Sequence, residues 1–241
     1  MGAGGGSRRW CSMTSLKEHK YLALLTVLVG ALIVQSLHPA LATTPATLNL
    51  VQTIIVVAVF LGVFEQRRTR VLALWLGIVT AVLGWSEYAM PADYYPLANA
   101  VEHSLRVAFL GFAAVAILGD IFKKRLVRAD DVLGAACGYF LAGIAWSNLF
   151  QVCEIAYPGS FSFSTAIGGQ LAAPLERAAV FNYFSFATLT TTGYGDITPL
   201  RGPATAFAML ETIFGQFYVA VLVAQLVGIR LAQAAQQFRE Q

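Results

Sequence analysis

Long runs of apolar residues limit most strongly what this chain can fold into. Only 12% of its residues are charged, about half the share of a soluble domain. A shorter apolar run at 178–190 cannot span a membrane and is expected to form a re-entrant half-helix. The pattern predicts an all-α membrane protein with six transmembrane helices. Each is near the roughly 20 residues that a span needs, and they lie at about 20–37, 48–64, 71–89, 104–122, 132–153 and 204–230.

The positions of the positive charges predict the orientation of these helices. If all six runs span, every cluster of Lys and Arg falls on one side, whereas residues 38–48 and 90–103 on the other side contain none. Positive charges favour the cytoplasmic side. We therefore expect a multi-pass protein of a cell membrane with both termini in the cytoplasm. The clusters are Arg8, Arg9, Lys17 and Lys20; Arg67, Arg68 and Arg70; Lys123, Lys124, Arg125 and Arg128; and Arg230 and Arg239.

The first apolar run has a second interpretation. Lys17 to Lys20, the run itself and Ala40-Leu41-Ala42 together resemble a cleavable signal peptide. The run is longer than the apolar core of about 7–15 residues that such peptides carry. Processing of residues 1–42 stays open at this stage, and the topology is the same in either case.

One polar stretch interrupts the apolar pattern near the C-terminus, with residues 187–199 reading A-T-L-T-T-T-G-Y-G-D-I-T-P. Irregular backbone at membrane depth is tolerated only inside protein or beside water. Glycine adopts positive φ without steric penalty, so Gly193 and Gly195 allow successive carbonyls to turn to one side. A row of carbonyl oxygens can replace the water shell of a cation. The stretch is therefore expected to line an aqueous path.

The string from Thr190 to Asp196, followed by Ile197-Thr198-Pro199, resembles the selectivity filter of tetrameric potassium channels. The family usually has Val or Ile where this chain has Thr192. One chain supplies one such segment, and a ring around an ion needs about four. The resemblance therefore implies a symmetric homotetramer in the lipid bilayer. It also implies that K⁺ is bound at Thr191, Thr192, Gly193 and Tyr194, with Gly195 completing the filter and Asp196 at its outer mouth.

Several residues are expected to support the filter. Tyr183 and Phe184 match an aromatic pair that, by resemblance, buttresses it, although simple core packing explains them as well. Some relatives have a glutamate at the position of Ala187 that pairs with the aspartate after the filter, so Asp196 must find another partner or stay hydrated. Glu211 is an ionisable group inside an apolar span, which indicates a function. We hypothesise that it braces the filter or the half-helix.

The last apolar run is expected to carry the gate. Gly215 matches the inner-helix hinge glycine of the family, but close packing without bending is the alternative. Small and apolar residues follow it at helical spacing. They are expected either to line an inner cavity with an apolar constriction or to pack on a neighbour, and they are Val219, Ala220, Val223 and Val227.

The front part resembles the six-helix cation-channel plan without its voltage sensor. A sensor needs several arginines on the fourth helix, and this helix holds Arg106 alone, one turn after Glu102. His103 is the best candidate for sensing pH. The expected divisions are an N-terminal tail (1–19), a four-helix part (20–122), a linker (123–131), a pore part (132–231) and a C-terminal tail (232–241).

The function expected from these features is passive, selective conduction of potassium without steep voltage gating. The sequence contains no nucleophile–base pair, metal-ligand cluster or phosphate loop, so we expect no enzyme activity, no cofactor and no substrate beyond permeant K⁺. The sequence also lacks a basic run with interleaved aromatic residues, so we expect no binding of nucleic acid. The alternatives are the membrane subunit of a potassium transporter, which carries several degenerate filters in one chain, and a nonselective cation channel.

Overall fold

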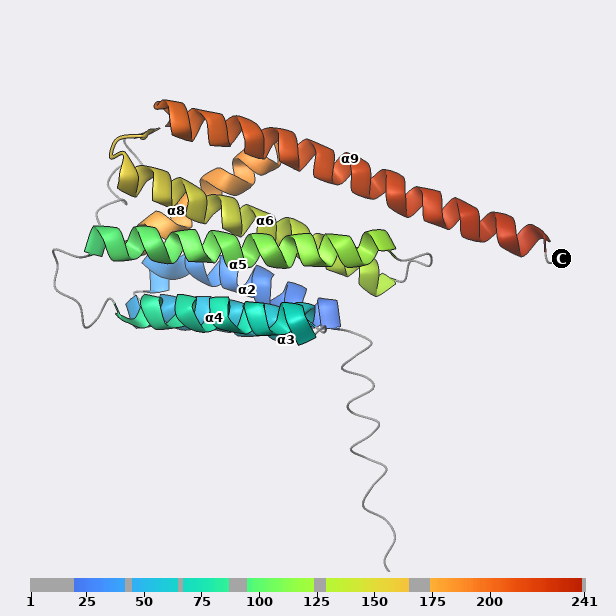
Figure 1. The fold of residues 1–241 in the computed structure, drawn as a ribbon. Coiled ribbons are helices and arrows are strands. Elements are labelled where there is room, and N and C mark those ends of the chain that lie inside the picture. The colour runs from blue at the N-terminus through green and yellow to red at the C-terminus, as the bar shows by residue number, and fades with distance from the viewer. Residues whose placement is uncertain are drawn as a thin grey trace, which may run out of the picture.

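The computed structural model describes residues 20–41, 45–64, 67–86, 95–123, 129–164 and 174–239. Predictions on the N-terminal tail (1–19) and on linker residues 124–128 lie outside this part of the chain. The described part is almost entirely helical (Figure 1), with the elements α2 (Lys20–Leu41), α3 (Pro45–Val63), α4 (Arg67–Ser86), α5 (Tyr95–Lys123), α6 (Ala129–Ala156), β1 (Phe161–Phe163), α8 (Pro174–Leu189), β2 (Ile197–Pro199) and α9 (Gly202–Arg239).

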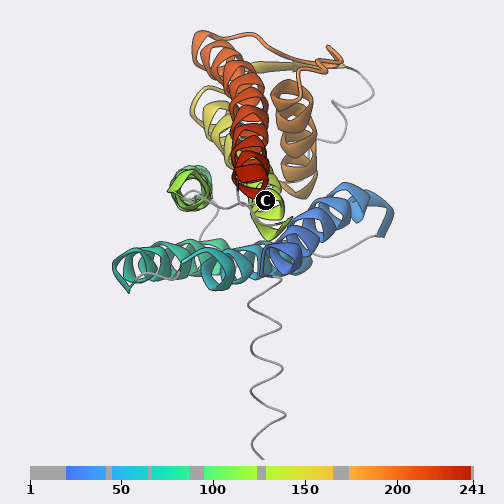
Figure 2. The same ribbon diagram turned by 90° about the vertical axis from the view of Figure 1, so that its right-hand side faces the viewer.

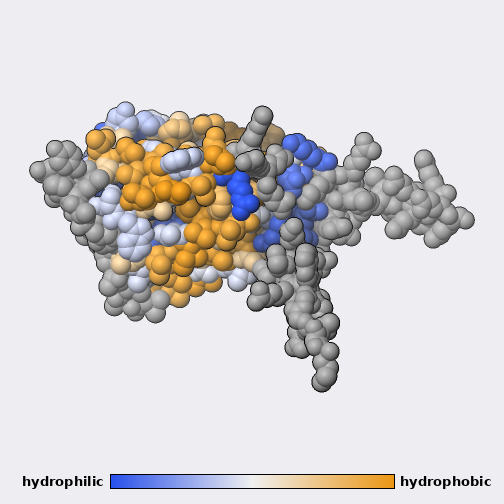
Figure 3. Space-filling model, turned by 60° about the horizontal axis from the view of Figure 1, so that its bottom comes forward, coloured by the Kyte–Doolittle hydropathy of each residue, from blue (hydrophilic) through white to orange (hydrophobic). Residues whose placement is uncertain are grey.

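Five of these helices, α2, α4, α5, α6 and α9, are long and apolar enough to cross a membrane. The apolar part of α3, Asn49–Val63, is shorter than the other five. The protein is thus a mostly helical membrane protein, and the expected span at 48–64 remains a prediction. Figure 3 shows apolar side chains across one broad face of the helices, with hydrophilic ones gathered towards one end.

The helices run side by side in layers. Figure 2 shows α2, α3 and α4 in one layer with α5 and α6 above it, while α8 lies beside α6 and above α2, and α9 lies furthest from the α3–α4 pair. The start of α2 and the end of α9 lie at the same end of the molecule (Figure 1). One apolar cluster joins α2, α3, α5 and α6 and includes Leu28, Val59, Phe109 and Leu141, all of them fully buried. The front helices and α6 therefore share one continuous core.

A second apolar cluster fixes α8 against α6 and the strands. Its centre is a set of phenylalanine rings in edge-to-face contact, an arrangement that aromatic rings prefer. The ring centroids of Phe150 and Phe184 lie 5.0 Å apart, and those of Phe161 and Phe181 lie 5.2 Å apart. Because Phe181 and Phe184 are consecutive inward positions of α8, this cluster sets the rotation of that helix.

A short antiparallel strand pair, which the sequence pattern did not predict, flanks α8 and the loop after it: β1 precedes α8, and β2 follows the loop. Strands β1 and β2 pair with Ser162 opposite Thr198. Beyond the pair, the Ser164 amide donates to the Asp196 carbonyl at 2.9 Å, and the Leu200 amide donates to the Ser160 carbonyl at 2.7 Å. The strand pair thereby holds the segment after Gly195 to the end of α6.

Candidate functional site

The loop after α8 folds back onto the last turn of that helix. The amide of Thr191 donates to the Thr188 carbonyl at 2.9 Å. The amides of Thr192 and Gly193 both donate to the Ala187 carbonyl, at 2.8 and 3.1 Å. These bonds satisfy helix-end carbonyls that would otherwise lack partners. They also direct the amides of the loop towards α8.

The backbone of the loop alternates in handedness. Thr191, Gly193 and Gly195 have positive φ, at 59°, 53° and 77°, whereas Thr192 and Tyr194 between them do not. In such an alternation successive N–H groups converge on one side, so the carbonyls converge on the other. Since the amides of Thr191, Thr192 and Gly193 bond to α8, we expect the carbonyls to face away from it. Residues 190 to 195 are all exposed in the single chain, which leaves this row of oxygens open.

Thr191 is the strained member of the loop. A β-branched residue with positive φ is a genuine outlier, and such a conformation costs about 1–3 kcal/mol and persists only where its surroundings hold it. Two contacts hold it here. The amide bonds to Thr188 as described, and the Thr191 hydroxyl oxygen accepts a hydrogen bond from Gln216 Nε2 at 3.0 Å.

Tyr183 contacts the loop, whereas its neighbour Phe184 packs in the phenylalanine cluster. The Tyr183 ring stacks on that of Tyr194, with centroids 5.8 Å apart and an interplanar angle of 9°. The Tyr183 hydroxyl donates to Asp196 Oδ2 at 2.6 Å. This hydrogen bond, more than burial or charge, raises the pKa of Tyr183 to about 12. Phe184 is buried in the phenylalanine cluster, so of the two interpretations core packing describes Phe184.

Asp196 has two partners in the absence of a glutamate at position 187. Besides Tyr183, it accepts a bond from the Ile197 amide at Oδ1, at 3.1 Å. The side chain is therefore fixed at the end of the loop and directed towards α8. The sequence had left its partner open, and the structure supplies a tyrosine from the half-helix.

Glu211 lies completely buried behind the loop. Its Oε1 is 2.5 Å from Ser185 Oγ, which in turn is 2.7 Å from the Gly143 carbonyl. The group therefore connects α9, α8 and α6 through one hydroxyl. Glu211 is therefore not a solvated residue at the mouth, and its role in bracing the half-helix remains a prediction.

Gly215 lies against the end of α8. A Cβ placed on it would be 2.0 Å from the Leu189 carbonyl oxygen, so no side chain fits. Tyr139 from α6 donates to the same oxygen at 3.2 Å. Helix α9 runs through this position without a break. The structure thus gives the close packing that was the alternative to a hinge, and bending at Gly215 remains a prediction.

The expected pore-lining residues lie on one face of α9. Val219, Val223 and Val227 are about half exposed, and Ala220 is exposed as well. Gln216 precedes them by three, seven and eleven positions, which is the spacing of one helix face. Gln216, Ser185 and Tyr139 were not predicted from the sequence. A polar residue inside the apolar span next to Gly215 was the available signal for Gln216.

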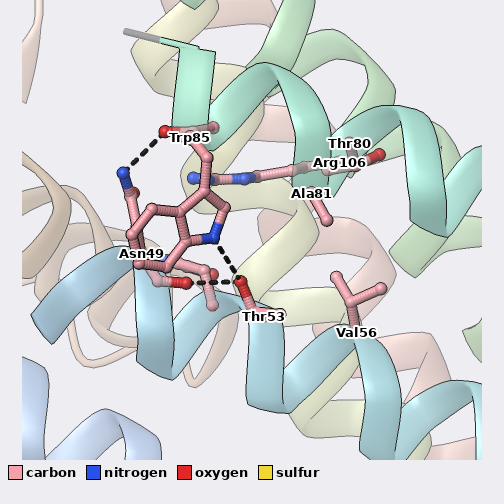
Figure 4. Close-up of a pocket in the computed structure, with 9 residues that line it drawn as sticks. Asn49, Thr53, Val56, Thr80, Ala81, Trp85 and Arg106 are labelled. Carbon is pink, nitrogen blue, oxygen red and sulfur yellow. Dashed lines mark hydrogen bonds between the residues drawn. The ribbon is translucent and has the colours of Figure 1, made fainter. Parts of the chain in front are cut away.

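A polar pocket lies between the front helices α3, α4 and α5 (Figure 4). Asn49 Nδ2 donates to the Gly84 carbonyl at 2.6 Å, and Trp85 Nε1 donates to Thr53 Oγ1 at 3.2 Å. Arg106 lines the pocket and pairs with Glu102 on its own helix. The free volume is about 10 Å³, which suffices for roughly one water. The charge of Arg106 on α5 is thus neutralised by Glu102 at the pocket.

Two further polar contacts join the front helices to the pore part. His103 Nδ1 and Asn148 Oδ1, on α5 and α6, lie 2.8 Å apart. Asn182 Nδ2 of α8 donates to Gln35 Oε1 of α2 at 2.6 Å, and both residues are buried. The second contact spans 147 positions in the sequence. It connects the first described helix directly to the half-helix.

Comparison with known proteins gives one match. The model of a protein family described as "Ion channel" matches residues 176–230. The match begins in the first turn of α8, includes the loop and ends in the last third of α9. No curated protein and no solved structure matches the chain. The match and the five apolar helices support an ion channel in a multi-pass membrane protein.

Proposed function

We propose that the protein is a potassium-selective channel in which four copies surround one conduction path. The alternating backbone of residues 191 to 195 carries this proposal, because it turns a row of carbonyl oxygens towards one open side. Four such rows around an axis would replace the water shell of K⁺. Each site would take oxygens from Thr191, Thr192, Gly193 and Tyr194.

The surroundings of the loop support the same assignment. Helix α8 ends at the loop, and the partial negative charge of a helix C-terminus favours a nearby cation. Tyr183 and the strand pair hold the outer end, and Glu211 and Gly215 hold α8 against α9. A rigid cage of this kind keeps the carbonyls at a fixed spacing. In the proposal, the apolar face of α9 below the loop forms a constriction that gates by dewetting.

The proposed topology has six spans, with α3 as the second and α8 re-entering from outside. Both termini then lie in the cytoplasm of the cell. The common end of α2 and α9 in Figure 1 supports this orientation. Arg106 carries one charge and is paired. Moving one charge across a membrane potential of about 100 mV changes the free energy by about 2.3 kcal/mol, and moving a paired one changes it by less. We therefore propose a channel without steep voltage gating.

The test is ion flux through the purified protein in liposomes, comparing potassium with sodium and adding barium as a blocker. Potassium flux that barium stops and sodium cannot replace is the expected result. Equal flux of both ions would mean a nonselective cation channel. Potassium uptake against its gradient, dependent on a second subunit, would mean a transporter. The sequence has a single Gly-Tyr-Gly string, whereas a transporter subunit carries several degenerate filters in one chain.

A further inference from the structure

The contact between α9 and the inner end of the loop has no role in the proposed function so far. We propose that Gln216 positions the hydroxyl of Thr191 and thereby sets the affinity of the innermost cation site. The inference rests on the proposed function and adds a positioning residue to it. The ligand class is a dehydrated cation of the size of K⁺, including Ba²⁺, which has nearly the same radius and twice the charge.

The hydrogen bond itself defines the orientation of the hydroxyl. A threonine hydroxyl has one proton and two acceptor lone pairs. The bond from Gln216 Nε2 occupies one lone pair of Thr191 Oγ1 and leaves the other for a cation. Without this donor the hydroxyl is free to rotate, because among the described residues no other side chain bonds to it. The innermost site then loses a fixed oxygen.

Helix packing places Gln216 at the correct height. Gly215 brings the backbone of α9 as close to the Leu189 carbonyl as a helix allows. Thr191 follows Leu189 by two residues, so the next side chain on α9 reaches its hydroxyl directly. A larger residue at 215 would move the Gln216 amide away.

Gln216 is also the polar residue at the start of an apolar face of α9. Val219, Val223 and Val227 follow it on the same side of α9. In a fourfold arrangement, four Gln216 side chains would lie next to the ring of Thr191 hydroxyls, on its cytoplasmic side. An ion moving outward therefore meets Gln216 after the apolar face and before the first filter oxygen. Both the position and the bond point to this residue as part of the innermost site.

The experiment measures the barium concentration that halves potassium flux in liposomes, for wild type and Gln216→Met. Methionine has the same length and lacks the donor. We expect the half-inhibitory concentration to rise about threefold to tenfold, the equivalent of one hydrogen bond. The control is Gln225→Met on the same helix. Gln225 lies nine positions further, on the opposite face, and its replacement is expected to leave the barium block unchanged.

Two backgrounds separate positioning from a general loss of structure. In Thr191→Ser the hydroxyl remains, and Gln216→Met should still weaken the barium block by a similar factor. In Thr191→Ala the hydroxyl is absent, and Gln216→Met should add nothing. Size-exclusion elution as a tetramer is required of each variant, and the serine background keeps the test valid if the alanine variant does not assemble.

Three outcomes contradict the inference. An unchanged barium block in a well-assembled Gln216→Met variant refutes it, as does a shift of the same size in the alanine background, and as does an equal shift in Gln225→Met. These results leave wild-type potassium flux intact and affect only Gln216. Wild-type protein without potassium flux or barium block would instead refute the proposed function, and the inference with it.

Discussion

Replacing Gly215 by alanine is expected to separate α9 from the end of α8 and to weaken the assembled protein. The added Cβ would lie 2.0 Å from the Leu189 carbonyl oxygen. To restore an ordinary contact distance of 3.4 Å, the two backbones must move apart by about 1.4 Å. Neither atom belongs to a flexible side chain, so one of the two helices has to shift. Overpacking of this kind costs typically about 1–3 kcal/mol, in each subunit.

The assay is the temperature at which the purified protein loses its assembled state in detergent, followed by size-exclusion chromatography after heating. We expect a clear decrease for Gly215→Ala. The matched control is Gly228→Ala on the same helix, where an added Cβ meets nothing within 4 Å. Alanine is the better helix former by about 1 kcal/mol, so the control should be neutral or stabilising.

An unchanged dissociation temperature for Gly215→Ala would refute the close-packing argument. The two interpretations of Gly215 also separate here. If Gly215→Ala assembles as stably as wild type but opens less often in single-channel recordings, the glycine acts as a hinge and not as a packing position. Loss of stability with normal opening in the surviving channels means packing alone.

Three further predictions concern the residues around the loop. Gly193→Ala places a Cβ at a φ of 53°, and the preference for potassium over sodium in flux assays should fall sharply; unchanged selectivity would mean that the filter lies elsewhere. Tyr183→Phe removes the hydrogen bond to Asp196 that raises the pKa of Tyr183 from 10.0 to about 12. A tyrosine whose pKa is raised on folding contributes its full stabilisation at any pH below its pKa in the unfolded chain. The difference in dissociation temperature between wild type and Tyr183→Phe should therefore be constant up to about pH 10. It should shrink as the pH rises through 12, and a difference that grows there would contradict the assignment of the donor. Glu211→Gln keeps a hydrogen-bonding partner for Ser185, whereas Glu211→Leu does not, so the leucine variant should dissociate at a clearly lower temperature; equal stability of the two would show that the contact is not needed.

The helices and the loop were largely predictable from the sequence because their signals are local. Apolar runs of span length mark α2, α4, α5, α6 and α9. Alternate glycines predict positive φ at 193 and 195. The positive φ of Thr191 was not predictable in this way. A β-branched residue disfavours that conformation, and only the contacts to Thr188 and Gln216 explain it.

The partners of individual side chains were not predictable, because they lie far apart in the sequence. Gln216 and Thr191 are 25 positions apart, and Ser185 and Glu211 are 26 apart. Periodicity assigns a residue to a face of its own helix but not to an atom on another helix. The strands β1 and β2 have three residues each, which is too few for an alternating pattern to be recognised.

The hydrogen bond between Gln35 and Asn182 has a consequence for how the protein is made. Helix α2 leaves the ribosome long before α8, yet the buried Asn182 of α8 has its hydrogen-bond partner, Gln35, on α2. Without Gln35, the buried Asn182 amide would lose this acceptor, and an unpaired buried polar group is costly. We therefore expect α8 to reach its final position only after it meets α2, which is made first. In a shortened chain that begins after α5, α8 would lack this contact, so we expect the pore part to be less stable without α2.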